Sequence, residues 1–454
     1  MNLSLPGVEK RLQDRYEKLV EEHTGHAHNV AAGPRILPGE TTVQAAAMAA
    51  WRFYHNPRTT FSSLAQPLVE AGCAAATQHC RDFALVALDW SWLDYRHQDS
   101  RTDRMAGKDG VLGYKLLAAL LLSDRDGRPL APLCEQLQSS EGLFSSRFDR
   151  PRRSGTALDE LAPVLDFVTG LPLGKRPVFI IDAEADSVFH LRLWHKRHFL
   201  FLVRVDTDRK VLLGGSDGEE MLLPDVAKRL KRDKAFRYVG KVKYEGRKVR
   251  QYVAEVAVIL HRPAWLNRQV DVDRWQRFVV PGKPLPLRLV VTELRDKGGK
   301  VLERWYLLSN LPAEVDAATV ARWYYWRWTI ETFYKLLKSA GQQVEQWQQD
   351  GSRAIFKRLL IASMACVLAW RLANSQASQA DAARRTVMRL SGRQLEHGKT
   401  YTLEGLVAGI WVLLAMMAIL QVVPLGRLQE IANFVLNGSI DGSTAAPTPL
   451  REAG

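Results

Sequence analysis

Three carboxylates in this sequence stand where they could converge on one site. Asp89 closes the apolar part of FALVALDW, residues 83–90, and Asp182 ends PVFIID, Pro177–Asp182, so each follows a predicted buried strand. Glu331 lies on a later predicted helix. Hard cations prefer oxygen ligands, and two ions roughly 3.5–4 Å apart stabilise both the attacking and the leaving oxygen of a phosphoryl transfer. The three residues are therefore candidate ligands of two Mg²⁺ ions.

Each carboxylate also has an ordinary structural explanation. Asp182 could simply cap the helix that follows its strand. Asp89 could be a polar residue at a strand end, and Asp82 and Asp94 are acidic residues close to it. The chemical interpretation therefore depends on all three positions together.

The stretch around Glu331, WYYWRWTIETFYKLLK (Trp323–Lys338), predicts one helix with two stripes. At 100° per residue, four polar side chains fall within about 60° of one another. They are Tyr324, Arg327, Glu331 and Lys338. The second stripe has core-facing spacing and consists of Trp323, Trp326, Ile330, Phe333 and Leu337. The alternative is a surface helix with an Arg327–Glu331 ion pair, worth only about 0.2–0.5 kcal/mol.

The composition is that of a globular protein with an anionic partner. The chain has 454 residues, which suggests about two to four domains, and a formal net charge of +14. A surplus of that size favours nucleic acid or a membrane surface. The four cysteines match no zinc pattern and follow no signal peptide, so we expect reduced thiols in a cytoplasmic protein.

The segment Gly405–Leu420, GLVAGIWVLLAMMAIL, contains no charged or polar side chain. It is shorter than the roughly 20 residues that a bilayer requires, and Gln421 and Pro424 close it. We therefore expect a buried or subunit-contacting helix here, and no membrane partner.

Hydrophobic patterning predicts an α/β (α+β) fold with a mixed sheet and flanking helices. Residues 83–138 have the texture of a three-stranded antiparallel meander, and residues 177–205 that of a strand, a helix and a strand. Short alternating basic segments interrupt this unit. The expected divisions are a helical region 1–78, a core of 79–205 and 288–340, a β-rich insertion 206–287, a helical region 341–436 and a flexible tail 437–454.

Four local sequences resemble the DDE transposases with a ribonuclease H-like core, and along the chain they follow the order that this family has. Bacterial insertion-sequence transposases carry a Tyr-Arg-Glu-Lys signature, in which two residues separate Tyr from Arg, three separate Arg from Glu and six separate Glu from Lys. Residues 324–338 have that spacing. DAEAD, Asp182–Asp186, resembles the family's second-aspartate motif, and ALDWSWLDYRH, Ala87–His97, its first. WYLLSN, Trp305–Asn310, resembles the strand before the signature helix. Ala183 and Trp90-Ser91 depart from the family's usual Arg and Thr-Thr, which affects substrate contacts more than metal binding.

The resemblance implies a catalytic mechanism and roles for these residues. Asp89, Asp182 and Glu331 would bind two Mg²⁺ (Mn²⁺ as a possible substitute) that activate water to nick the element's ends, and the freed 3′ hydroxyl would attack target DNA. Arg327 and Lys338 would contact phosphate oxygens, with Tyr324 beside them. The family acts as a dimer on double-stranded terminal repeats. By position, the helical region 1–78 resembles the part that binds these DNA ends, and the helical region 341–436 is where we expect dimer contact. Trp305 would either hold an unpaired base or belong to the core.

DNA contact has independent support in Lys228–Arg250, which holds eleven basic and two acidic residues. Basic side chains neutralise phosphates, and interleaved aromatic rings can stack on bases. The candidates are Lys228, Arg229, Lys231, Arg232, Arg237, Lys241 and Lys243. A solvated basic surface is the alternative.

Other functions agree with parts of the pattern. A nuclease of the same fold would share the first chemical step without joining strands. A non-catalytic DNA-binding descendant of a transposase would keep the basic surface, and a membrane protein would use Gly405–Leu420. The sequence favours a metal-dependent DNA transposase.

Overall fold

The computed structural model describes residues 3–25, 43–107, 110–153, 155–215, 217–271, 274–338, 341–394 and 401–437. Its helices are α1 (Lys10–Gly25), α2 (Val43–His55), α3 (Phe61–His79), α4 (Leu161–Thr169), α5 (Val188–Lys196), α6 (Leu223–Arg232), α7 (Ala317–Trp326), α8 (Thr329–Leu337), α9 (Ser352–Asn374), α10 (Ala380–Leu390), α11 (Leu403–Val422) and α12 (Leu425–Asn437). Its strands are β1 (Phe83–Asp94), β2 (Met105–Ala106), β3 (Leu112–Ser123), β4 (Pro129–Ser139), β5 (Gly142–Ser145), β6 (Phe148–Arg152), β7 (Arg176–Ile181), β8 (Leu200–Val205), β9 (Lys210–Leu213), β10 (Glu219–Leu222), β11 (Arg237–Tyr244), β12 (Arg247–Leu260), β13 (Ala264–Asp271), β14 (Arg274–Val280), β15 (Leu285–Arg295) and β16 (Val301–Ser309).

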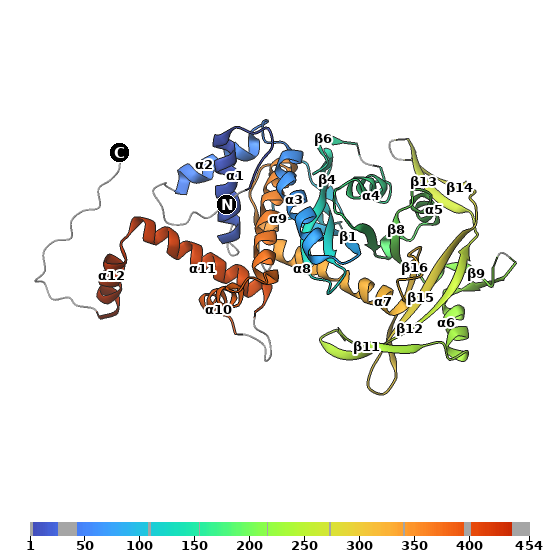
Figure 1. The fold of residues 1–454 in the computed structure, drawn as a ribbon. Coiled ribbons are helices and arrows are strands. Elements are labelled where there is room, and N and C mark those ends of the chain that lie inside the picture. Colours follow the sequence, from blue (N-terminus) through green and yellow to red (C-terminus); the bar gives the residue numbers. More distant parts are fainter. Residues whose placement is uncertain are drawn as a thin grey trace, which may run out of the picture.

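Five strands form the centre of the fold, in the order β4-β3-β1-β7-β8. β1 pairs antiparallel with β3, and β3 with β4, so the predicted meander is confirmed. β7 is parallel to both of its neighbours, β1 and β8. The mixed sheet with helices around it (Figure 1) confirms the predicted α+β fold class with flanking helices.

Both faces of this sheet are buried, which explains why its strands are continuous apolar runs. Successive side chains of a strand point to opposite faces. In β1, Leu85 and Ala87 belong to one core, whereas Val86 and Leu88 belong to the other. The first core receives side chains from α1, α3, α7, α8 and α9, and the second from α4, α5 and α6. The sheet therefore lies between two helical layers.

The insertion of residues 206–287 continues the central sheet. β12 pairs with β15, β15 with β16, and β16 with β8, so one ladder of hydrogen bonds joins the insertion to the core. β13 and β14 form a separate two-stranded sheet. Helix α6 was not predicted, because its four apolar contacts, Leu223, Val226, Ala227 and Leu230, are scattered through a short basic stretch.

The apolar segment near the C-terminus belongs to α11, which is longer than its uncharged stretch. Leu406 and Val407, near its start, are buried, whereas Met417 and Leu420 are 53% and 44% exposed. The predicted buried or subunit-contacting helix is thus buried at one end only. By length and composition, Leu403–Gln421 is the one described helix that could cross a membrane, a test that core helices of soluble proteins also pass. Apart from Asn437, the predicted tail 437–454 lies outside the described residues.

Candidate active site

The parallel pairing of β1 with β7 brings two aspartates to the same level of the sheet. The last paired residues are Leu88 and Ile181, and Asp89 and Asp182 come next on each strand. β7 ends there, but β1 continues to Asp94 because β3 still pairs with it. The predicted strand end at Asp89 is therefore wrong: the residue lies within β1, at the point where pairing on the β7 side stops.

A single guanidinium connects the three predicted carboxylates. Nη1 of Arg327 donates to Oδ2 of Asp89 at 2.9 Å, and Nη2 lies 3.0 Å from Oδ2 of Asp182. Nη2 also lies 3.4 Å from Oε1 of Glu331. Only 3% of the Arg327 side chain is exposed. The structure thus gathers Asp89, Asp182 and Glu331 around one buried cation.

Arg327 lies at a junction between two helices. The single helix predicted for residues 323–338 is in fact α7 and α8, with Arg327 and Trp328 between them. Here the amide of Glu331 donates to the carbonyl of Trp328, three residues back, which is 3-10 spacing. Such a turn advances side chains by about 120° per residue, so Glu331 is rotated from its place in a continuous α-helix.

Two further side chains hold Asp182. Oη of Tyr324 donates to its Oδ1 at 3.1 Å, and Nε of Arg204 lies 2.7 Å from the same oxygen. Arg204 is on β8 and was not among the predicted site residues. A single arginine inside the apolar run HFLFLVRV was the only sequence signal for it.

The two aspartates differ in acidity. Burial raises the pKa of Asp89 above its usual value, against the opposing influence of Arg327 and a backbone amide. Burial acts in the same direction on Asp182, but Arg327, a backbone amide and Arg204 together outweigh it, so the pKa of Asp182 is below its usual value. Asp89 and Asp182 help to raise the pKa of Arg327 above its usual value, although burial acts in the opposite direction. Arg327 therefore carries a positive charge.

The donor set suits a hard cation in kind. Asp89 on β1 and Asp182 directly after β7 supply carboxylate oxygens, and Glu331, which is 57% exposed, supplies a third carboxylate. Within the described residues, no group of three or more His, Cys, Asp or Glu side chains stands close enough to hold a metal. Arg327 lies between the carboxylates, and its Nε is buried without a hydrogen-bond partner. A divalent ion and Arg327 would therefore compete for the same oxygens.

Tyr334 fixes α8 against the strand that carries Asp89. Its hydroxyl donates to the carbonyl of Asp89 at 2.5 Å and accepts from the amide of Ala118 at 3.1 Å. Asp89 and Ala118 are paired residues of β1 and β3. The phenol thus bridges the two strands at the level of the site, a role that the sequence did not reveal because Tyr334 looks like one more apolar residue of its helix.

The last residue of the signature, Lys338, lies beyond the carboxylates. Its Nζ donates to the carbonyl of Trp92 at 2.5 Å and lies 3.5 Å from Oε1 of Glu345. Lys338 therefore joins the end of α8 to β1 further along the strand than Asp89.

Trp305 belongs to the core. Only 2% of it is exposed, and its ring centroid lies 5.3 Å from that of Tyr324 and 6.1 Å from that of Trp328. A base cannot reach this ring in the structure described. Of the two explanations that the sequence left open, the structure agrees with the core tryptophan. Its ring packs against that of Tyr324.

The seven predicted phosphate-binding residues of the basic segment are exposed on α6 and β11. They are Lys228, Arg229, Lys231, Arg232, Arg237, Lys241 and Lys243. Three of them pair with neighbouring carboxylates: Lys228 with Asp225, Arg229 with Glu219 and Arg232 with Asp233. Their positive charge is thus partly neutralised on α6 and less so on β11.

Strand β11 is attached to the signature helices. The hydroxyl of Tyr325 donates to the carbonyl of Lys243 at 2.9 Å and accepts from its amide at 3.2 Å. The ring of Tyr244 lies 6.0 Å from that of Trp328. The basic strand therefore contacts residues on both sides of Arg327 in the sequence.

No family model matches the chain, and no curated protein matches it. Among solved structures, it is similar to the piggyBac transposase in a synaptic complex with hairpin DNA, with a TM-score of 0.34 and 10% identity, over 82% of this chain and 61% of that one. The chain thus spans less than two thirds of the length of that relative.

Proposed function

We propose that this protein is a DNA transposase whose catalytic residues are Asp89, Asp182 and Glu331. One observation carries the proposal: carboxylates from three distant parts of the chain lie within 2.9 to 3.4 Å of the same guanidinium. So dense a charge cluster requires compensation, and active sites are where such clusters are common. The net charge of +14 agrees with a polyanionic substrate.

The three carboxylates would hold Mg²⁺, or Mn²⁺ in its place. Bound ions would supply Lewis acidity and an activated water for phosphodiester cleavage. Asp182, whose pKa is below its usual value, remains an anion throughout the neutral range. Tyr334 keeps Asp89 at the level of Asp182 by holding the backbone of β1.

Arg327 would exchange partners during the reaction. Its planar fork matches a phosphate as well as it matches a carboxylate. When other cations neutralise Asp89 and Asp182, the guanidinium is free to bind an oxygen of the scissile phosphate. Its location at a helix junction provides a hinge for that movement.

The basic residues of β11 would guide double-stranded DNA to the site. Arg237, Lys241 and Lys243 are exposed on that strand, and Tyr325 connects Lys243 to α7. Contacts of this kind bind the phosphate backbone without reading the sequence.

A second copy of the chain would complete the assembly. The exposed half of α11 and the side chains of α12 form an apolar surface that includes Met417, Leu420, Phe434, Val435 and Leu436. An apolar surface of this kind usually marks an interaction site. We assign it to a homodimer that holds two DNA ends.

The test is a nicking and joining assay on duplex DNA with the flanking terminal repeats, plus a target plasmid, in Mg²⁺ or Ca²⁺. Asp89→Asn is compared with Asp94→Asn, a matched change five residues further along β1. Asp94 pairs with Arg96 at the surface and contacts none of the three carboxylates. We expect Asp89→Asn to abolish Mg²⁺-dependent products and Asp94→Asn to keep them.

The products separate the remaining possibilities. Joined strands identify a transposase, and nicks without joining identify a nuclease of the same fold. Equal activity of wild type and Asp89→Asn would exclude the proposed catalytic site. Binding of the repeats without any cleavage, by every variant, would indicate a non-catalytic DNA-binding protein.

A further inference from the structure

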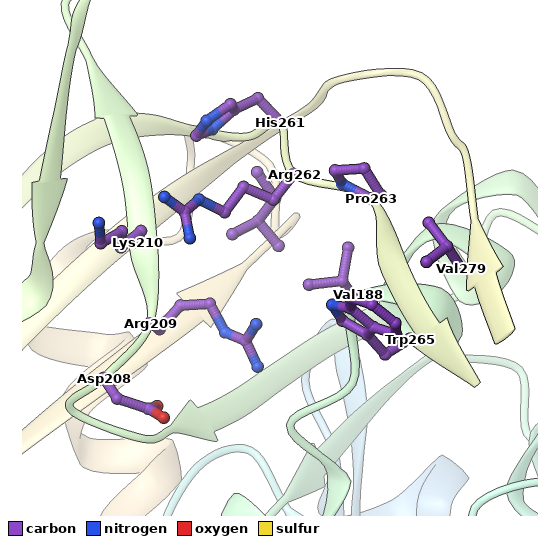
Figure 2. Close-up of a pocket in the computed structure, with 10 residues that line it drawn as sticks. Val188, Asp208, Arg209, Lys210, His261, Arg262, Pro263, Trp265 and Val279 are labelled. Carbon is purple, nitrogen blue, oxygen red and sulfur yellow. The ribbon is translucent and has the colours of Figure 1, made fainter. Parts of the chain in front are cut away.

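A hollow lies between the β13–β14 hairpin, the start of α5 and strand β9. Two adjoining cavities of about 380 and 520 Å³ share Val188, Arg209 and Trp265 on their walls. In Figure 2, the indole of Trp265 and the side chain of Val188 lie on one side, and the basic side chains of Arg262 and Lys210 on the other. None of these residues belongs to the carboxylate cluster or to the basic segment.

The hairpin presents Trp265 to solvent in a fixed orientation. The residue is 53% exposed, whereas the large apolar side chain of tryptophan is highly buried on average. The guanidinium carbon of Arg277, on β14, lies 4.2 Å from the ring centroid, and Val279 is the cross-strand partner of Trp265. An aromatic ring held open beside a guanidinium is the usual platform on which unpaired bases stack.

Basic side chains are anchored along the opposite wall. Oxygens of Glu220 lie 2.6 Å from Arg262, 2.9 Å from His261 and 3.3 Å from Lys210. One carboxylate therefore orients three basic side chains, and the two charges of Arg262 and Lys210 exceed that of Glu220, although Asp208 also lines the cavity. Fixed cations of this kind bind the phosphate that accompanies a base.

The hollow also shares a turn with the carboxylate cluster. That turn begins at Asp182, which contacts Arg327, and ends at Asp186, which lies 2.8 Å from Nη2 of Arg209. Arg209 lines both cavities. A strand that leaves the carboxylates would therefore pass one turn of backbone before it reaches Trp265.

We infer that this hollow binds an unpaired nucleotide of a DNA strand, with the base on Trp265 and a phosphate near Arg262. The inference rests on the proposed function for the identity of the polymer, but it concerns a separate set of residues. It predicts that single-stranded DNA binds here more tightly than a free nucleotide does, because neighbouring phosphates meet the basic wall.

The experiment measures binding of a short single-stranded oligonucleotide that contains 2-aminopurine, whose fluorescence falls when it stacks on an indole. The full chain is used with EDTA, so that no cleavage occurs. Trp265→Ala and Trp265→Phe are compared with Trp51→Ala. Trp51 is a matched control for single-strand binding because it is 46% exposed on α2, in the region predicted to bind duplex ends, and it lines neither cavity. Thermal unfolding verifies that each variant is folded.

We expect Trp265→Ala to weaken single-strand binding about tenfold and to remove the quenching. Trp265→Phe should keep part of both, and Trp51→Ala should behave as wild type. Equal affinity of wild type and Trp265→Ala would overturn the inference. Competition by deoxyadenosine monophosphate as strong as that of the oligonucleotide would also overturn it, in favour of a free-nucleotide site.

Failure of the inference and failure of the proposed function give different results. Loss of strand binding in Trp265→Ala, in a protein that never nicks DNA, supports the hollow and counts against the catalytic proposal. Normal nicking by wild type, with unchanged strand binding in Trp265→Ala, counts against the hollow alone.

Discussion

Arg327 and Asp182 are joined by a contact of 3.0 Å between Nη2 and Oδ2, deep enough that only 3% of the arginine side chain is exposed. The same guanidinium reaches Asp89 at 2.9 Å. The arginine thus provides the positive charge that two adjacent aspartates require. Any divalent ion that binds these aspartates changes the affinity of Arg327 for them, and the effect is reciprocal.

Replacement of Arg327 by Gln should destabilise the protein and strengthen metal binding. Loss of one partner leaves the buried carboxylates uncompensated, at a cost on the order of 3 kcal/mol. Without its competitor, a divalent ion binds more tightly and stabilises the folded state by mass action. We expect a lower Tm in EDTA and a larger rise in Tm with Ca²⁺ or Mn²⁺ than wild type shows.

The matched control for this prediction is Arg96→Gln. Arg96 pairs with Asp94 at the surface, where an ion pair contributes little to stability. Its Tm should stay close to that of wild type in both conditions. Identical metal responses of Arg327→Gln and wild type would show that Arg327 and the ion do not compete.

Tyr334→Phe should loosen β1 at the level of Asp89. The change removes one hydroxyl that donates to the carbonyl of Asp89 and accepts from the amide of Ala118. A buried polar group left without its partner costs about 1–3 kcal/mol. Chemical denaturation should report that loss. Tyr325→Phe, whose hydroxyl contacts the exposed backbone of Lys243, should lose less, and an equal loss in both would contradict the bridging role.

Stability should fall with rising pH because of Glu135. Burial raises the pKa of this residue on β4 from 4.5 to about 8, against a hydrogen bond from Ser363 that favours the anion. The folded state therefore binds the proton more tightly than the unfolded state does. The stabilisation is complete below about pH 4.5 and is lost as the pH rises towards 8.

Glu135→Gln tests this sign directly. The amide cannot ionise, so the variant should lose less stability than wild type between pH 6 and 8.5. Denaturant titrations across that range measure the slope. Glu141→Gln is the control, because Glu141 is exposed in the turn after β4 and should leave the slope unchanged. A wild-type slope in Glu135→Gln would mean that other groups determine the pH dependence.

Charged substitutions on α12 should dissociate the proposed dimer. Phe434 and Leu436 are 65% and 80% exposed, so Asp at either position should leave the fold intact. Sedimentation velocity should then detect monomers where wild type forms dimers on DNA. Leu302→Asp is the control, as Leu302 is an exposed apolar residue on β16. A wild type that remains monomeric on paired ends would remove the basis for this surface.

Local patterns predicted the strands of the central sheet, but they predicted neither α6 nor the exact junctions between elements. The apolar runs of β1, β7 and β16 predicted strands without an alternation of apolar and polar residues, because both faces of these strands are buried. The predicted strand end at Asp89 was wrong because β1 continues to pair with β3 beyond this residue, and this pairing depends on the tertiary structure. The break at Arg327 was missed for a similar reason, since nothing in WYYWRWTIETF disfavours a continuous helix.

The site residues divide in the same way. Asp89, Asp182 and Glu331 were selected from their positions after strands and on a helix, and the structure brings them together around Arg327. Arg204 could not be selected, because its partner Asp182 follows a different strand, β7, and only the folded sheet brings the two together. Trp305 could not be assigned, since a buried and a base-binding tryptophan have the same sequence environment.

The shared ladder between insertion and core has a consequence for how the chain is made. β16 pairs with β8, so residues on either side of the insertion must meet, and β12 must be in place beside β15. When the ribosome has reached residue 284, it has made β1, β3, β4, β7 and β8. The strand β16, which pairs with the other edge of β8, has not yet been made. Because long-range strand pairing is slow, the nascent chain exposes that edge until β16 (Val301–Ser309) has left the ribosome. A pause in translation before β15 should therefore favour aggregation. Chaperones that act during synthesis would bind the exposed edge of β8.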